Sequence, residues 1–104
     1  MLIQRFILNQ DGSVSEEPNL LAWMNWFDQA NPLIAHNRLL DGTHISTVFL
    51  GINRNYGSGS PLLFETMVIG GPHTGYLQRY GTKEEALEGH AKAVRIAQGK
   101  AGAA

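Results

Sequence analysis

The residues best suited to chemistry in this 104-residue chain are one isolated glutamate and four histidines: Glu65, His36, His44, His73 and His90. The histidines are dispersed, and no two of them have the His-x-x-x-His spacing of a helical metal site. A metal site would need three of them, or histidine with carboxylate, to converge from separate elements. His90 falls in an apolar stripe, where a lone histidine is more commonly a buried side chain with a hydrogen-bond partner. We therefore expect no metal, no cofactor and no catalytic residue.

Glu65 stands alone among apolar residues in the stretch "PLLFETMVIGG". Side chains alternate along a strand, so Glu65 would share one face with Met67 and Ile69 while Phe64 points to the other. Both faces are apolar, and the pattern does not say which one faces the core. If the Phe64 face is inward, Glu65 is a solvated carboxylate on an unusually apolar outer face. If the Glu65 face is inward, the carboxylate needs a partner to offset its desolvation. The candidate partners are Arg54, Arg79 and His90.

A glycine-rich loop precedes this strand. The nine residues of "NRNYGSGSP", Asn53 to Pro61, are more than a hairpin needs for closure, and they include Arg and Tyr, types favoured at binding hot spots. The loop lacks the spacing and the strand-to-helix context of a phosphate loop. We hypothesise that the hairpin Gly51–Gly71, with the loop that follows it, forms the functional surface, and an idle variable loop is the alternative. The candidate binding residues are Arg54, Asn55, Tyr56, Glu65, His73 and Arg79.

Two segments have the periodicity of helices. The first is predicted near residues 18–30, with Pro18 in its first turn and the pair Asn31-Pro32 after its end. Its apolar residues recur at helical spacing and are interpreted as core: Leu20, Trp23, Met24 and Phe27.

The second helix is predicted near 82–98, because Thr82 and Glu85 have the spacing of a capping box and Gly99 can end the helix. We expect the tail, 99–104, to be frayed. The apolar stripe of this helix is predicted to comprise Leu87, His90, Ala91, Val94 and Ala97.

The strands between and before the helices follow from β-prone runs bounded by turn residues. "LIQRFILN", Leu2 to Asn9, is followed by the turn "QDGS", and Asp41-Gly42 is a hairpin signal between two further runs. Strands are predicted near 33–40, 43–53 and 62–70, with a short final strand through "YLQRY". The sequence thus predicts one domain, 1–104, of the α+β class: an antiparallel sheet of three to five strands with two helices packed on one face.

Composition narrows the classes of partner. Eight basic and nine acidic residues give a formal charge of −1, and the basic residues are scattered, so we expect no binding of duplex nucleic acid. There are no cysteines, which excludes a disulfide scaffold and thiolate zinc sites. No apolar run approaches the length of a membrane span, and the N-terminus is too polar for a signal peptide. We therefore expect no membrane partner.

Two longer strings carry a resemblance. "ISTVFLGINRNYGSGSPLLFETMVIGGP" followed by "RYGTKEEALEGHAKAV" resembles a group of short proteins of unknown function encoded by bacteriophages and prophages. An upstream Trp-x-x-Trp-Phe also matches, at Trp23, Trp26 and Phe27, so the resemblance covers roughly residues 20–95. The chain departs from the family pattern where Asp-His is usual, carrying Asn53 and Arg54, which weakens an acid–base or metal role for that loop. The resemblance implies a phage setting.

Three functions follow as hypotheses. The first is a phage accessory protein in the host cytoplasm that acts by non-enzymatic binding, inhibiting a host protein such as a CRISPR–Cas or other antiphage defence component. The second is a binder or sponge for a nucleotide signal, with arginines and glycine-loop amides as ligands. Sponge sites often lie between subunits, so a homodimer stays open. The third and weakest is a metal-dependent hydrolase using Glu65, His73 and His90.

Overall fold

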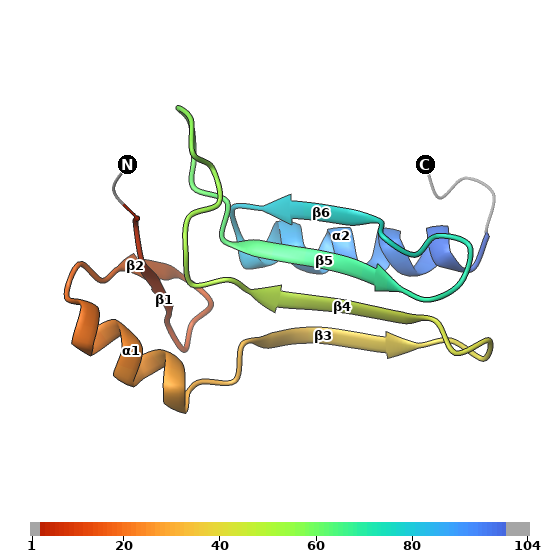
Figure 1. Ribbon diagram of the computed structural model, residues 1–104, viewed down its shortest axis with the longest axis horizontal. Coiled ribbons are helices and arrows are strands. Elements are labelled where there is room, and N and C mark those ends of the chain that lie inside the picture. The colour runs from red at the N-terminus through yellow and green to blue at the C-terminus, as the bar shows by residue number, and fades with distance from the viewer. Residues whose placement is uncertain (1–2, 100–104) are drawn as a thin grey trace.

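The computed structural model describes residues 3–99, which form a four-stranded sheet backed by one helix and, at one end, a small hairpin beside a second helix (Figure 1). The predicted α+β class is confirmed. The tail that was predicted to fray lies, from residue 100 onward, outside the described part of the chain. The elements in chain order are β1 (Phe6–Leu8), β2 (Val14–Glu16), α1 (Leu20–Gln29), β3 (Leu33–Arg38), β4 (His44–Phe49), β5 (Phe64–Ile69), β6 (Leu77–Tyr80) and α2 (Lys83–Ala97).

The larger sheet has the order β3-β4-β5-β6, and every neighbouring pair is antiparallel. The predicted pairing of 43–53 with 62–70 is confirmed, although β4 ends earlier than predicted. Beyond Phe49 the chain also turns toward the small hairpin, where the Phe6 amide donates to the Gly51 carbonyl at 2.9 Å and Arg5 bridges to Ile52. This segment therefore joins the hairpin to the main sheet.

The β1–β2 and β3–β4 hairpins close with the same turn. In each, an aspartate accepts a hydrogen bond from the amide two residues later: Ser13 to Asp11 at 2.9 Å and Thr43 to Asp41 at 2.9 Å. A glycine follows each aspartate with φ of +89° and +90°, in the left-handed region that glycine adopts without strain. The Ser13 hydroxyl and amide lower the pKa of Asp11, and the Thr43 amide and hydroxyl lower the pKa of Asp41. Both turns were predicted, but β2 was missed because its sequence, Val-Ser-Glu, is too short and polar to show a pattern.

The face of the sheet that carries Phe64 is the core, which resolves the alternative left open by the sequence. α2 packs across this face, chiefly on β4 and β5, and lies behind the sheet in Figure 1. Two apolar clusters occupy the two ends of the buried face, one around Phe49 and Phe64 and the other around Ile45 and Val68. Between them the inward side chains are polar, so a polar layer divides the core.

The N-terminal end of α2 is capped as predicted. Thr82 Oγ1 accepts a hydrogen bond from the Glu85 amide at 3.1 Å and donates one to the Glu85 carboxylate at 3.0 Å. Gly99 follows the last turn with φ of +70°, as a helix-ending glycine does. The cap is therefore the part of this helix that local sequence determines most directly.

The buried stripe of α2 differs from the prediction. Its fully buried residues are Ala86, His90 and Ala93, whereas the predicted Leu87 and Ala91 are exposed. The small side chains of Ala86 and Ala93 let the helix lie close to the sheet. The buried positions of this helix are therefore occupied by small residues and not by its large apolar ones.

Gly89 in the middle of α2 is explained by the same close approach. A Cβ atom at this position would collide with the ring and hydroxyl of Tyr80 on β6. The Tyr80 hydroxyl is buried and makes no hydrogen bond to any residue between 3 and 99. The helix thus accepts the low helix propensity of glycine so that β6 can pack beneath it.

α1 is only partly core. Asn19 caps it by accepting from the Ala22 amide at 2.9 Å, so Pro18 precedes the cap and does not lie in the first turn. Trp23 Nε1 donates to the Phe6 carbonyl at 3.0 Å, and Trp26 packs edge-on against the core. The other half of the predicted stripe, Leu20 and Met24, is exposed, contrary to the prediction. Only its aromatic side is covered, by the β1–β2 hairpin and by the core around Phe49.

Neither helix in residues 3–99 has both the length and the apolar character needed to cross a membrane.

Candidate binding surface

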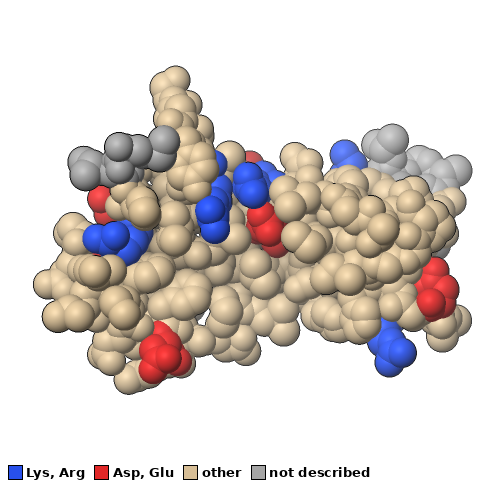
Figure 2. Space-filling model, viewed as in Figure 1, with Lys and Arg blue, Asp and Glu red and all other residues tan. Residues whose placement is uncertain are grey.

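The face of the sheet opposite α2 is open, because no helix or strand among residues 3–99 packs across it. It carries apolar side chains that are partly in solvent: Leu33 is 46 %, Ile69 50 % and Leu77 39 % exposed. Figure 2 views this side and shows that most of it is uncharged, with basic and acidic side chains together at the foot of the projecting loop. Exposed apolar area of this kind is a common property of interaction surfaces.

Glu65 lies on this open face and is paired with Arg79. The two residues are directly opposite in the β5–β6 register, and Arg79 Nε lies 2.9 Å from Glu65 Oε2. The carboxylate side chain is 14 % exposed and the guanidinium side chain 38 %. A pair this accessible adds at most about 1 kcal/mol to stability. Glu65 is thus a cross-strand partner of Arg79, one of the three candidate partners considered from the sequence.

The loop 53–61 projects from the end of the sheet as a narrow finger (green in Figure 1). Its base is built by Asn53, whose Oδ1 accepts from the amides of Asn55 and Leu62 at 2.8 and 3.0 Å. Within the finger, Arg54 Nη1 donates to the Tyr56 hydroxyl at 2.9 Å, and both side chains are exposed. Asn53 thus has a structural role at the base of the loop.

The open face also carries two histidines that the sequence analysis did not connect. His36 on β3 and His44 on β4 lie with Nε2 and Nδ1 2.9 Å apart and ring centroids 5.1 Å apart. The register brings them together: Arg38 pairs with His44, and His36, two residues from Arg38, therefore lies on the same face as His44.

The opposite, covered face holds a chain of polar groups that runs from the exposed Asn37 to buried residues of the core. His90 Nε2 donates to Asn37 Oδ1 at 2.7 Å, its Nδ1 accepts from the Thr47 hydroxyl at 2.7 Å, and Thr47 lies 2.5 Å from the Thr66 hydroxyl. A hydroxyl, an imidazole and an orienting amide in sequence resemble the arrangement of a nucleophile and its base. Both threonines, however, are 0 % exposed, so no substrate can reach them. This chain satisfies buried polar groups and is structural.

The ionisation of His90 agrees with that role. Burial lowers its pKa, and the nearby His36 lowers it further. The imidazole is therefore neutral near pH 7, with one nitrogen donating and the other accepting. Burial also raises the pKa of the Tyr80 hydroxyl on the same side of the sheet.

The structure separates several residues that the sequence grouped. Glu65 is on the open face, His90 is beneath the other face, and His73 lies in the turn after β5. The three side chains proposed for a hydrolase are thus not brought together. Within residues 3–99 no three histidine, aspartate or glutamate side chains gather as a metal site would require.

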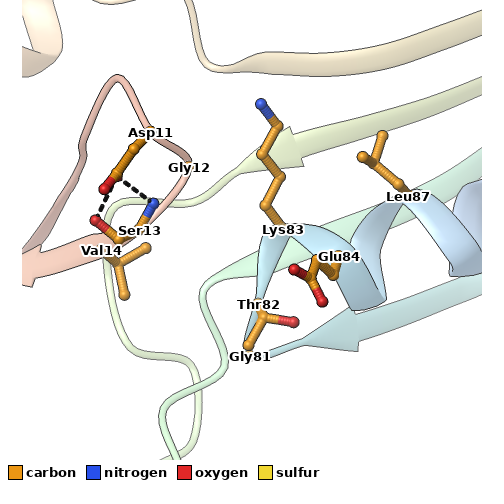
Figure 3. Close-up of a pocket in the computed structure, with 9 residues that line it drawn as sticks. All are labelled: Asp11, Gly12, Ser13, Val14, Gly81, Thr82, Lys83, Glu84 and Leu87. Carbon is orange, nitrogen blue, oxygen red and sulfur yellow. Dashed lines mark hydrogen bonds between the residues drawn. The ribbon is translucent and has the colours of Figure 1, made fainter.

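A pocket of about 420 Å³ lies between the β1–β2 turn and the first turn of α2 (Figure 3). Asp11 in this pocket is already hydrogen-bonded to Ser13, and Lys83 lies beside the acidic Glu84. Leu87, exposed on α2, forms part of its apolar wall. The mixed charges give the pocket no clear preference for an anion or a cation.

Comparison of the chain with family models, with curated proteins and with solved structures found no match.

Proposed function

We propose that this chain is a small phage accessory protein that acts without catalysis, by binding a host protein in the host cytoplasm through the open face of its sheet. The most specific form of the proposal is inhibition of a CRISPR–Cas or other antiphage defence component. The phage setting rests on the sequence resemblance, and the mode of action rests on the surface.

The observation that carries the proposal is the exposure of Leu33, Ile69 and Leu77 on one side of a well-formed sheet. Ile69 and Leu77 lie on the neighbouring strands β5 and β6, Leu33 lies at the other end of the same face on β3, and exposed apolar side chains of this kind suit an apolar patch of a protein partner. A nucleotide would meet different chemistry there. Arg79 is already paired with Glu65, and that carboxylate would repel a phosphate.

The finger at 53–61 supplies polar contacts beside the apolar face. Arg54 and Tyr56 are held together by their hydrogen bond, and both residue types are enriched at the centres of protein interfaces. An arginine anchored in this way loses less conformational freedom when a partner binds.

The test begins by capturing a partner from infected host lysate and then measures its affinity with purified proteins. Leu77→Glu on the open face should weaken binding by on the order of 2 kcal/mol, since it places a charge in the apolar contact. The matched control is Leu87→Glu, an exposed leucine on α2 at the other side of the molecule, which should leave affinity unchanged. Equal losses in both variants, or none in either, would contradict the proposed surface.

A second pair of variants tests the finger. Replacing both Arg54 and Tyr56 by alanine should also weaken binding by about 2 kcal/mol while the melting temperature stays nearly constant, because the loop lies outside the core. Unchanged binding would mean that the sheet face is the whole interface and that the finger makes no contact with the partner.

Leu21→Glu, on the exposed side of α1, distinguishes an interface on the helix from one on the sheet.

A further inference from the structure

The His36–His44 pair is built into a rigid part of the fold. His36 is directly opposite Ser46 in the β3–β4 register, and His44 is two residues away, so the histidines are diagonal neighbours on one face. Diagonal side chains start about 7–8 Å apart at the backbone, a span that two imidazole rings can bridge. Their hairpin is closed by the hydrogen-bonded Asp41 turn. Backbone pairing therefore places the Cα and Cβ atoms of both histidines, and neither residue lies in a flexible loop.

The distance between the two facing nitrogens has a chemical meaning. His36 Nε2 and His44 Nδ1 are 2.9 Å apart. Two imidazole nitrogens bound to one metal ion at about 2.0–2.1 Å are about 2.9 Å apart when they subtend a right angle, and about 3.3–3.4 Å apart in a tetrahedral site. The observed separation, which is set by the hydrogen bond between the rings, equals that of the right-angle arrangement, and each ring must turn so that its lone pair points to the ion.

We propose that His36 and His44 form a two-histidine site for a divalent transition-metal ion of tetragonal preference, Cu²⁺ or Ni²⁺, with water completing the coordination. Imidazole suits these ions, and tetragonal geometry places neighbouring ligands at right angles. Zn²⁺ prefers the tetrahedral arrangement and fits the 2.9 Å separation less well. The site is separate from the proposed protein-binding function, although it lies on the same face.

Binding requires a proton to change position. In the pair as it stands, one facing nitrogen donates its hydrogen to the other, so only one lone pair is free. The donor ring must adopt the other neutral tautomer, with its hydrogen on the nitrogen that faces away. His36 is exposed, so its remaining N–H can donate to water. The metal displaces no net proton from the neutral pair, and protonation of either ring competes with it.

One neighbouring charge opposes the site. Arg38 is directly opposite His44 and exposed on the same face, so its guanidinium disfavours a bound cation. This gives the proposal a signed prediction: Arg38→Gln should tighten metal binding. His90, the other histidine near His36, lies on the covered side and is occupied by Asn37 and Thr47.

The experiment titrates the full, untagged chain with CuCl₂ at neutral pH by calorimetry, and records the Cu²⁺ spin-resonance spectrum for nitrogen coupling. We expect one ion per chain, coupling to two nitrogens, and weaker binding of ZnCl₂. Loss of an outer-shell partner alone costs about 10–100-fold in metal affinity, so His36→Gln or His44→Gln should each cost at least roughly tenfold. His73→Gln is the matched control, an exposed histidine outside the pair, and should change nothing.

Three results would overturn the site. They are an undiminished affinity in His36→Gln, an equal loss in His73→Gln, and a spectrum without two coupled nitrogens. Because His36 is exposed on an outer strand, its substitution should leave the thermal melt unchanged, and that measurement excludes misfolding as the cause of any loss.

Discussion

Histidines lie at both faces of the four-stranded sheet, buried at one face and accessible to solvent at the other. On the covered side, His90 of α2 is held by Asn37 and Thr47, and the hydroxyl that resembles a nucleophile cannot be reached by a substrate. On the open side, His36 and His44 are accessible but have no third partner of catalytic type among the described residues. The comparison teaches that accessibility, more than the arrangement of side chains, separates a structural polar cluster from a candidate site.

The largest expected effect is on packing at the covered face. Phe64→Ala should lower the free energy of unfolding by about 3–5 kcal/mol, because it leaves a cavity against α2. Met67→Ala, on the same strand but half-exposed on the open face, should cost only about 1–2 kcal/mol. Denaturant unfolding of both variants measures the difference. Equal costs would show that the open face is buried in solution, for example against a second copy.

The contact between β6 and α2 gives the next effect. Gly89→Ala should destabilise the protein by about 1–3 kcal/mol, because the added methyl group collides with Tyr80. In an unobstructed helix the same change would stabilise by about 1 kcal/mol, so the sign itself is diagnostic. Gly57→Ala in the finger, where a Cβ has room, is the control and should be nearly neutral. A stabilised Gly89→Ala variant would mean that Tyr80 does not lie beneath the helix.

The buried polar layer gives a smaller effect. Thr47→Val keeps the shape but removes the hydroxyl that donates to His90, so we expect a loss of about 1–2 kcal/mol from the unpaired imidazole nitrogen. Ser46→Ala, the neighbouring residue on the open face, should change stability by less than about 0.5 kcal/mol. Unfolding free energies of this pair of variants compare the two faces at adjacent positions of one strand. A neutral Thr47→Val would mean that water replaces the hydroxyl.

The smallest effect is the pH dependence of His90. Its pKa is lowered in the folded protein by burial, so the unfolded chain takes up a proton more readily than the folded chain. The contribution of His90 to the free energy of unfolding should be complete above the unfolded histidine pKa of about 6.5. It should decline as the pH falls through that value and become constant below the folded pKa. His90→Gln should flatten this part of the curve relative to the wild type. An identical slope in both proteins would assign the dependence to other groups.

The fold was predicted where local chemistry decides it. Thr82 and Glu85 determine where α2 begins, and Asp41 with Gly42 closes its hairpin, because each signal acts within a few residues. The choice of the buried sheet face depended on contacts with α2, and the two faces around Glu65 are equally apolar in sequence. Periodicity alone could not settle it.

The candidate site was predicted only in part. Arg54 and Tyr56 were chosen by residue type and do interact, and Glu65 does pair with Arg79. The His36–His44 pair was missed because helical ligand spacing does not reveal two residues that meet across a hairpin. The proposed partner and setting stay predictions.

The paired hydroxyls of Thr47 and Thr66 also select among alternative alignments while the protein folds. A slip of β4 against β5 by two residues would keep every side chain on its proper face, so hydrophobic burial alone would hardly oppose it. Such a slip would place Thr47 opposite Phe64 or Val68 and separate the buried Thr66 hydroxyl from Thr47, at about 1–3 kcal/mol. The hydrogen bond between two threonines thus distinguishes the native register of two similar apolar strands from the registers shifted by two residues.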